Sequence, residues 1–268
     1  MVDFATVIGF IIGIVSLMMG FLLEGGSLGS LFEGTAALIV FGGTIGAVVI
    51  SFPLATLKKV PFILKYAFYK KTPQPDKVIE QLTELANISR REGLLALEAQ
   101  SQLYEEDEFL ADGIQMIVDG VESEMVEDIL NRDIELYEEN ILSVGRIFES
   151  AGGFAPTMGI IGTVMGLVHV LGNLSEPGNL GPSIAVAFIA TLYGIASANV
   201  IYLPLFNKIK VRLAQEILIR DIQTEGLMSI QNGENTTILR KKLMAFTDKD
   251  KKRRVTDKKI ETEAAFNE

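Results

Sequence analysis

The chain has 268 residues, of which 49% are hydrophobic, and its mean hydropathy is positive at +0.33, which indicates a membrane protein with a substantial part outside the bilayer. The sequence contains no cysteine and a single histidine, His169, which excludes disulfides, thiolate metal sites and multi-histidine metal sites. A net charge of −10 argues against nucleic-acid binding, because neutralising phosphates requires a basic face.

Four apolar stretches are long enough to cross a bilayer as helices. The first lacks the basic segment of a secretory signal, so we interpret it as a retained span. The second contains glycines that permit close helix contact, and it ends at Pro53, where a run of lysines begins. The spans are expected at Phe4–Leu23, Thr35–Phe52, Ala151–Leu171 and Ser183–Leu205.

The remaining sequence predicts a helical module. Its apolar residues recur at helical spacing without strand alternation, and the pattern runs on into the third span. Helices are expected at Asp76–Arg91, Leu94–Leu103, Glu108–Val118, Val121–Ser150, Phe206–Ile230 and Thr237–Phe246. The predicted fold class is all-α: a polytopic membrane protein with four transmembrane helices and a helical cytoplasmic domain.

This interpretation divides the chain into five segments. Residues 1–52 hold the first two transmembrane helices with a short outer loop, 53–150 form the helical domain, and 151–205 form a transmembrane hairpin. Residues 206–247 extend the last span as a helix. The charged tail, 248–268, is predicted to be disordered.

The basic residues predict the orientation in the membrane. All 24 lysines and arginines lie either between Pro53 and Ser150 (ten) or after Leu205 (fourteen), whereas the short loops Glu24–Glu33 and Gly172–Pro182 contain none. By the positive-inside rule, both termini and the large loop are expected in the cytoplasm.

The third and fourth spans carry small residues at helical spacing, and each places a threonine on that face. Thr163 lies in line with Pro156 and Gly159, and Thr191 lies in line with Gly194. Each threonine is eight residues from the outer end of its span, at a depth of about 12 Å. Two interpretations stay open: a narrow polar path lined by the two hydroxyls, and ordinary close packing of membrane helices.

None of the four spans contains an aspartate, glutamate, lysine or arginine. Proteins that move protons or cations nearly always place an ionisable group at membrane depth. His169 lies too close to the outer end of the third span, where we interpret it as an interfacial polar residue. If the chain helps to conduct an ion, the titrating carboxylate is expected to come from another subunit.

Several local motifs stand out within this layout. They are Ser89–Glu98 (SRREGLLALE), Ala155–Thr163 (APTMGIIGT), Ala190–Gly194 (ATLYG) and Leu203–Leu205 (LPL). Together with the layout of the spans, they resemble the MotA flagellar stator proteins of the MotA/TolQ/ExbB ion-channel superfamily. The first motif resembles the charged cytoplasmic motif of that family, the second the start of its third span, and the last two parts of its fourth span. The resemblance as a whole covers residues 4–232.

The resemblance implies a pentamer of this chain around two helices of a MotB-type partner, in the inner membrane of a bacterium. That single-span partner would supply the membrane aspartate that these spans lack. Ion flow past the aspartate would drive the pentamer, and the cytoplasmic domain would push on the rotor switch protein of the flagellar C-ring. No cofactor and no resident metal are expected.

Within the membrane, the resemblance implies that Thr163 and Thr191 line the ion path. It also implies that Pro156 and Pro204 couple ion binding to helix movement, since a proline frees a backbone carbonyl and permits a hinge. The residues alone leave other interpretations open: Pro156 in the first turn of a helix, and Pro204 at the end of the fourth span. In the outer loop, Glu33 resembles an acidic position of sodium-type members, although a loop acid is also compatible with plain solvation.

Outside the membrane, the resemblance implies that Arg90 and Glu98 are the rotor-facing charges, with Arg91 a weaker candidate. The alternative is a set of solvated surface charges. Because Gly93 stands between the arginines and Glu98, the three charges need not share one helix.

The transported ion is expected to be a proton, with sodium kept open. Sodium needs several oxygen ligands in place of its hydration shell, whereas a proton needs only a carboxylate and a chain of waters. The proton is the default of the superfamily, but the threonine at position 163 resembles sodium-type members.

Two other classes remain as alternatives: a TolQ/ExbB-like energiser of outer-membrane processes, and a non-conducting membrane scaffold. The four spans and the charged motif count against the energiser. A scaffold predicts that Thr163→Val and Pro156→Ala leave motility unchanged. An enzyme is not expected, because the sequence shows no nucleophile–base pair, metal cluster or phosphate-binding loop.

Overall fold

The computed structural model describes residues 4–69, 74–104, 106–172 and 177–247. These residues form helices and turns without a strand, which confirms the all-α fold class. The charged tail that was predicted to be disordered lies outside the described residues.

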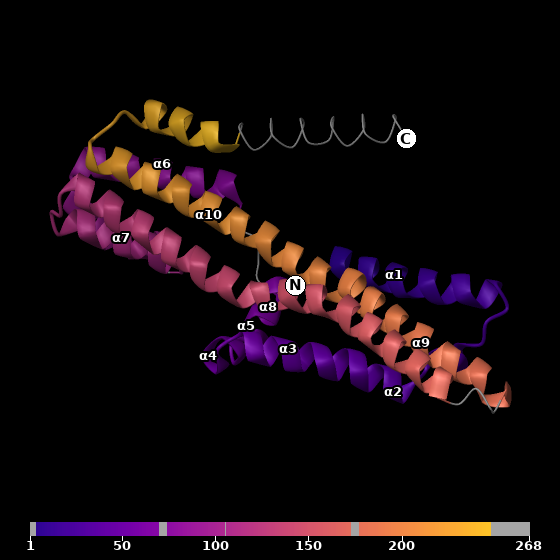
Figure 1. The fold of residues 1–268 in the computed structure, drawn as a ribbon. Helices are drawn as coiled ribbons and strands as arrows, with labels where there is room; N and C mark the ends of the chain where they lie inside the picture. The colour runs from indigo at the N-terminus through magenta and orange to yellow at the C-terminus, as the bar shows by residue number, and fades with distance from the viewer. Residues whose placement is uncertain (1–3, 70–73, 105, 173–176, 248–268) are drawn as a thin grey trace, which may run out of the picture. The chain divides into compact units, whose positions relative to one another are not determined.

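The chain, drawn in Figure 1, divides into two compact units. The membrane unit comprises residues 1–71 and 140–212, and the loop unit comprises residues 72–139 and 213–268. Helix α8 (Ser123–Gly172) begins in the loop unit and ends in the membrane unit, and α10 (Leu203–Gln231) does the reverse. Helices α8 and α10 thus continue from the third and fourth spans into residues of the loop unit.

The membrane unit contains the four predicted spans, each long and apolar enough to cross a bilayer. The first has the predicted bounds, and its large apolar side chains are mostly exposed, as contact with lipid requires. In chain order before α8, the membrane unit contains α1 (Phe4–Leu23), a 3₁₀ turn (Leu28–Leu31), α2 (Gly34–Ala37), a π turn (Leu38–Gly42), α3 (Gly43–Ser51), α4 (Leu54–Leu57) and α5 (Val60–Tyr69). After α8 come α9 (Pro177–Ser197) and a second π turn (Ala198–Tyr202), which leads into α10.

The third span belongs to a single helix of 50 residues, α8. The helix expected at Val121–Ser150 and the span expected at Ala151–Leu171 are therefore continuous. Pro156 lies in the interior of α8, so the interpretation that placed it in the first turn of a helix is wrong. An interior proline leaves the carbonyl four residues earlier, here that of Gly152, without its usual helical donor.

The helix of the fourth span continues past Pro204, as the helix expected at Phe206–Ile230 predicts. The chain continues helically from α9 through the second π turn into α10, and Pro204 is the second residue of α10. A proline ring clashes with the carbonyl four residues earlier, which here belongs to Val200. Because that carbonyl lies inside the π turn, the wider winding there accommodates the ring.

Two helices after the second span, α4 and α5, were not predicted from the sequence. In α5, the buried face consists of Ile63, Tyr66 and Ala67, and Arg212 of α10 donates from Nη1 to the carbonyl of Ala67 at 2.8 Å. The spacing of three and four residues was the available signal, but the lysines on either side of it obscure the apolar face.

The described residues of the loop unit form five helical segments and a 3₁₀ segment. Helix α7 (Glu108–Val118) has the predicted bounds, and α6 (Pro75–Glu92) extends one residue beyond the prediction at each end. The helix expected at Leu94–Leu103 is instead a 3₁₀ segment, because Gly93, at φ +90°, ends α6 and Gln100 has non-helical dihedral angles. The first part of α8 and the last part of α10 complete the unit, together with a helix over residues 236–247.

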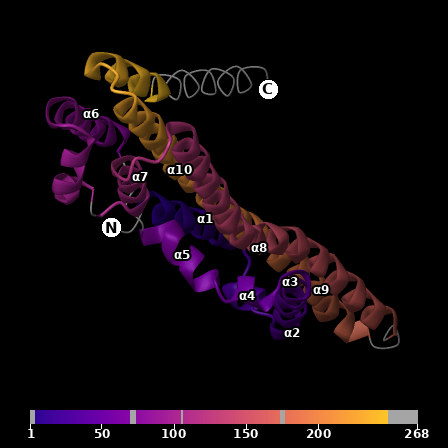
Figure 2. The same ribbon diagram turned by 90° about the vertical axis from the view of Figure 1, so that its left-hand side faces the viewer.

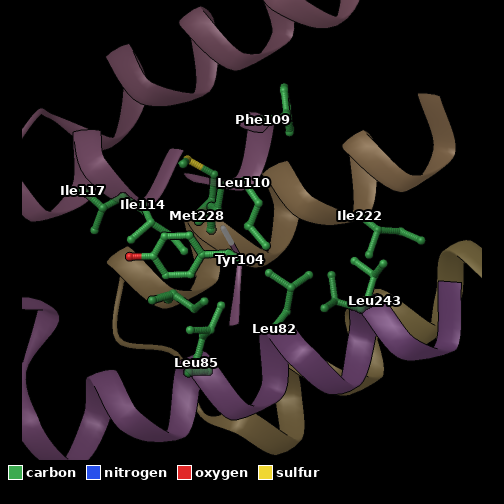
Figure 3. Close-up of a cluster of buried hydrophobic side chains, with 14 of the residues drawn as sticks. Leu82, Leu85, Tyr104, Phe109, Leu110, Ile114, Ile117, Ile222, Met228 and Leu243 are labelled. Atoms are coloured by element: carbon green, nitrogen blue, oxygen red, sulfur yellow. The ribbon is translucent and has the colours of Figure 1, made fainter. Parts of the chain in front are cut away.

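The core of the loop unit gathers apolar side chains from α6, α7, α8 and α10 (Figure 3). Glycine permits the closest approaches: a β-carbon on Gly226 of α10 would lie 2.7 Å from Cδ1 of Leu82 on α6. The guanidinium of Arg220 on α10 packs on the ring of Tyr137 at 3.9 Å and pairs with Asp133 at 2.6 Å. A dense apolar core therefore stabilises the loop unit, together with the contacts of the Arg220 guanidinium with Tyr137 and Asp133.

Replacing Leu110 with alanine is expected to lower the free energy of unfolding by about 2–5 kcal/mol, because the fully buried side chain leaves a cavity. The measurement is denaturant unfolding of the purified full-length chain in detergent, followed by near-ultraviolet circular dichroism. Leu95→Ala in the same unit is the matched control: Leu95 is 72% exposed, and its loss should cost less than about 0.5 kcal/mol. Equal effects of the two substitutions would contradict the assignment of Leu110 to the core.

Candidate functional site

Helices α8 and α9 lie side by side (Figures 1 and 2). They approach closely along a seam of small residues. A β-carbon on Gly159 would lie 2.9 Å from the carbonyl oxygen of Ala190. One on Gly162 would lie 2.7 Å from Cβ of Ala190, and one on Gly166 would lie 2.7 Å from Cβ of Ala187. Real β-carbons essentially never come within 3.0 Å of such atoms, so larger residues here would force the helices apart.

Thr163 and Thr191 meet across this seam. Their hydroxyl groups are in direct hydrogen-bond contact, which confirms that the two residues lie at one depth. Oγ1 of Thr163 also lies 2.9 Å from the carbonyl oxygen of Ala187 and 3.1 Å from that of Gly159. Oγ1 of Thr191 lies 3.4 Å from the carbonyl oxygen of Gly159. Both threonines are half-buried, so the pair is packed and still reachable from one side.

Each hydroxyl has one proton and donates one hydrogen bond, which limits the possible hydrogen-bond arrangements of the threonine pair. In one arrangement Thr191 donates to Thr163, which donates to the carbonyl of Ala187. In the other, Thr163 donates to Thr191, which donates to the carbonyl of Gly159. Either way the donor chain ends on the backbone, and the first threonine keeps its lone pairs as acceptors for a water or a cation. Close packing and a polar path are therefore compatible uses of the same contacts.

The region around Pro156 packs against the residues that lead to Pro204. A β-carbon on Gly194 would lie 3.1 Å from Cα of Pro156, and one on Gly152 would lie 2.6 Å from Cδ2 of Leu203. The second π turn lies between these two contacts along the fourth span. The structure thus brings Pro156 to the segment that contains the π turn, while the side chain of Pro204 itself is exposed.

Tyr193 on α9 is a functional candidate that the sequence did not single out. Its hydroxyl donates to the carbonyl of Leu31 and accepts the backbone N–H of Glu33 at 3.1 Å. Its ring stacks on Phe41 of the second span, with centroids 5.9 Å apart. Glu33 precedes the first residue of α2, and its carboxylate accepts a hydrogen bond from Thr35 at 2.9 Å. The only sequence signal for Tyr193 was its place two residues after Thr191 in the ATLYG motif.

The charged motif Ser89–Glu98 runs from the end of α6, across Gly93, into the 3₁₀ segment. Arg90 and Arg91 lie in the last turn of α6, Glu98 lies in the 3₁₀ segment, and all three are exposed. Burial, and secondly the negative charge of Glu98, raises the pKa of Tyr104, whose hydroxyl donates to the carbonyl of Leu97 at 3.0 Å. The backbone just before Glu98 is therefore anchored by a buried hydrogen bond, and Glu98 does not share a helix with the two arginines.

Comparison with known proteins decides the family. The chain is 38% identical over 245 residues to motility protein A of Bacillus subtilis, which covers 91% of this chain and 90% of the relative. Residues 101–222 match the model of the MotA/TolQ/ExbB proton channel family, and residues 7–93 match that of the motility protein A N-terminal region. The chain belongs to the MotA/TolQ/ExbB family. It is also 34% identical to the chemotaxis protein PomA of Vibrio alginolyticus over 250 residues, or 93% of this chain and 97% of PomA.

Solved structures of the family have the same fold. The structure of C. jejuni MotAB matches with a TM-score of 0.86 and 31% identity, over 91% of this chain and 95% of the other. The flagellar MotAB stator complex from Bacillus subtilis matches with a TM-score of 0.83 and 37% identity, over 90% and 95%. The chain is therefore a multi-pass membrane protein and an ion-channel subunit of a flagellar stator. It is not an enzyme, and the match to the motility protein A N-terminal region favours the stator over the energiser and the scaffold.

Proposed function

We propose that this chain forms a pentamer around two helices of a MotB-type partner, and that ions crossing between them drive torque. The observation that carries the proposal is the Thr163–Thr191 hydroxyl pair, held in a tight seam within spans that contain no aspartate, glutamate, lysine or arginine, and a single histidine, His169, near one end. Such a pair can order water or ligate a cation, but it cannot itself bind and release a proton at membrane depth. The similarity to MotAB complexes supports a partner that supplies the missing aspartate.

The proposed transported ion is the proton. The half-buried hydroxyl pair presents lone pairs to a water chain that leads to the aspartate of the partner. Sodium is the alternative, because the same lone pairs and the carbonyl of Gly159 offer oxygen ligands. Glu33, at the start of the second span, would then add a negative charge at the outer mouth.

The proposed coupling element is the contact between Pro156 and the segment of the fourth span that contains the π turn. π turns and interior prolines both loosen the helical hydrogen-bond ladder, so small changes of winding cost least at such positions. Protonation or ion binding at the aspartate of the partner would shift this contact, and with it the helix that carries Pro204.

The proposed orientation places both termini and the large loop between the second and third spans in the cytoplasm of a bacterial cell. The basic residues of that loop and of the chain after Leu205, and their absence from the short loops, support this orientation. The exposed charges of Arg90, Arg91 and Glu98 would then face the rotor switch protein of the C-ring.

The test is swimming speed against sodium at fixed pH, and against pH at fixed sodium, in cells whose only stator is this chain with its partner. A proton path predicts speed that ignores sodium and collapses with a protonophore. Thr163→Ala is expected to shift the ion dependence of speed, because it removes the hydroxyl shared by both donor chains. A steep sodium dependence that Thr163→Ala abolishes would identify the pair as a sodium site instead. No motility under any condition would contradict the stator assignment.

A further inference from the structure

Tyr193 fastens the fourth span to the turn that precedes the second span. Both hydrogen-bond partners of its hydroxyl are backbone groups, the carbonyl of Leu31 and the N–H of Glu33. Backbone groups cannot swing away as flexible side chains can, so the two bonds define one position for the phenol. The stack on Phe41 fixes the plane of the ring as well.

The same segment of α9 is held from the opposite side by α8. Residues two apart on an α-helix project about 200° apart, so Thr191 and Tyr193 face nearly opposite directions. Thr191 meets Thr163 of α8, and Tyr193 meets the second span and the turn before it. Any rotation of α9 that turns the Thr191 hydroxyl must therefore break the hydrogen bonds of Tyr193.

Ala190 shows how little freedom remains between the two contacts. It is 1% exposed and packs with Ala36 and Val40 of the second span. Its carbonyl and Cβ also form the wall that Gly159 and Gly162 of α8 approach. The fourth span is thus clamped between two neighbours at the level of Thr191.

We propose that Tyr193 is a positioning residue for ion passage: it sets the rotation of the fourth span and thereby holds the Thr191 hydroxyl against Thr163. This inference rests on the proposed ion path through the two threonines. It also links that path to the turn Leu31–Glu33, so that a change in the turn alters how Thr191 presents its oxygen.

The test uses Tyr193→Phe, which keeps the ring and its stack but removes both hydrogen bonds to the turn. The assay is the speed of single motors as stators join one by one, in cells whose only stator is this chain with its partner. It separates the number of stators from the speed per stator. We expect a normal number of stators. We also expect the half-saturating concentration of the driving ion to shift by at least about fivefold, which is the lower end of the change in affinity that coupling between two sites produces.

Thr35→Val is the matched control. It removes the hydrogen bond to the Glu33 carboxylate in the same turn but leaves both backbone bonds of Tyr193 in place. Its ion dependence should equal that of the unmodified chain. Phe41→Leu, which loosens the ring and keeps the hydroxyl, should shift the ion dependence in the same direction as Tyr193→Phe, but less.

Unchanged ion dependence per stator in Tyr193→Phe, with or without fewer stators, would overturn the inference and leave Tyr193 a purely structural contact. If Tyr193→Phe does not assemble, the absence of any shift in Phe41→Leu would overturn it equally. Thr163→Ala, run in the same series, separates the two proposals. If Thr163→Ala shifts the ion dependence and Tyr193→Phe does not, only the positioning inference fails, whereas no shift in Thr163→Ala contradicts the ion path itself.

Discussion

Replacing Gly159 with alanine is expected to abolish motility without removing the protein from the membrane. The new β-carbon would lie 2.9 Å from the carbonyl oxygen of Ala190 and 3.1 Å from Cα of Thr191. Both are backbone atoms, so no change of rotamer relieves the clash, and α8 and α9 must separate. Such overpacking costs about 1–3 kcal/mol, and here it also pulls apart the hydroxyls of Thr163 and Thr191.

The measurement is spreading in soft agar, with the amount of protein in the membrane fraction determined by immunoblot. Gly153→Ala is the matched control on the same helix, because its β-carbon would meet nothing within 4 Å. It should swim normally, since the same chemical change is made where there is space. If Gly159→Ala swims as well as Gly153→Ala, the two helices do not approach as closely as described.

Reversing the charge of Arg90 is expected to abolish torque while membrane insertion and assembly stay intact. Arg90 is exposed at the end of α6, so Arg90→Glu removes no packing, and only the sign of charge offered to the rotor changes. A complementary charge reversal on the rotor switch protein should restore part of the torque. The measurement is the rotation rate of tethered cells that carry each combination.

Arg132→Glu provides the control for a general effect of charge. Arg132 is also exposed on the loop unit, and its ion pair with Glu135 is a surface pair worth about 0–1 kcal/mol. Its reversal should leave rotation nearly unchanged. Normal rotation in Arg90→Glu, or equal loss in both variants, would show that Arg90 is not the specific contact with the rotor.

Local periodicity predicted much of the fold and the centre of the site. The bounds of α7, and nearly those of α6, follow from apolar spacing. The rhythm of small residues predicted that each threonine lies on the small-residue face of its span. Their equal distance from the outer ends predicted that Thr163 and Thr191 lie at one depth, and their hydroxyls do meet. These features depend on residues within a few turns of one another, where helical geometry is fixed.

Long-range contacts limited the rest. The bonds between Tyr193 and Leu31 or Glu33 join residues about 160 positions apart, and no local pattern encodes them. The rule that proline ends a helix fails at Pro204, because a π turn and tertiary packing together override it. At Leu94–Leu103 the spacing suited an α-helix, but Gly93 set a different start for the segment.

The second π turn also sets the direction in which the side chains of α10 point about the helix axis. An α-helix advances about 100° per residue, so one residue absorbed in a wider turn sets the later side chains back by about that angle. Phe206 and Ile209 of α10 then fall within van der Waals distance of a β-carbon placed on Gly145 of α8. Deleting a single residue from Ala198–Tyr202 would restore an unbroken α-helix and swing both side chains about a quarter turn away from α8. A family member that lacked this extra residue would therefore need a different set of apolar positions along its last helix.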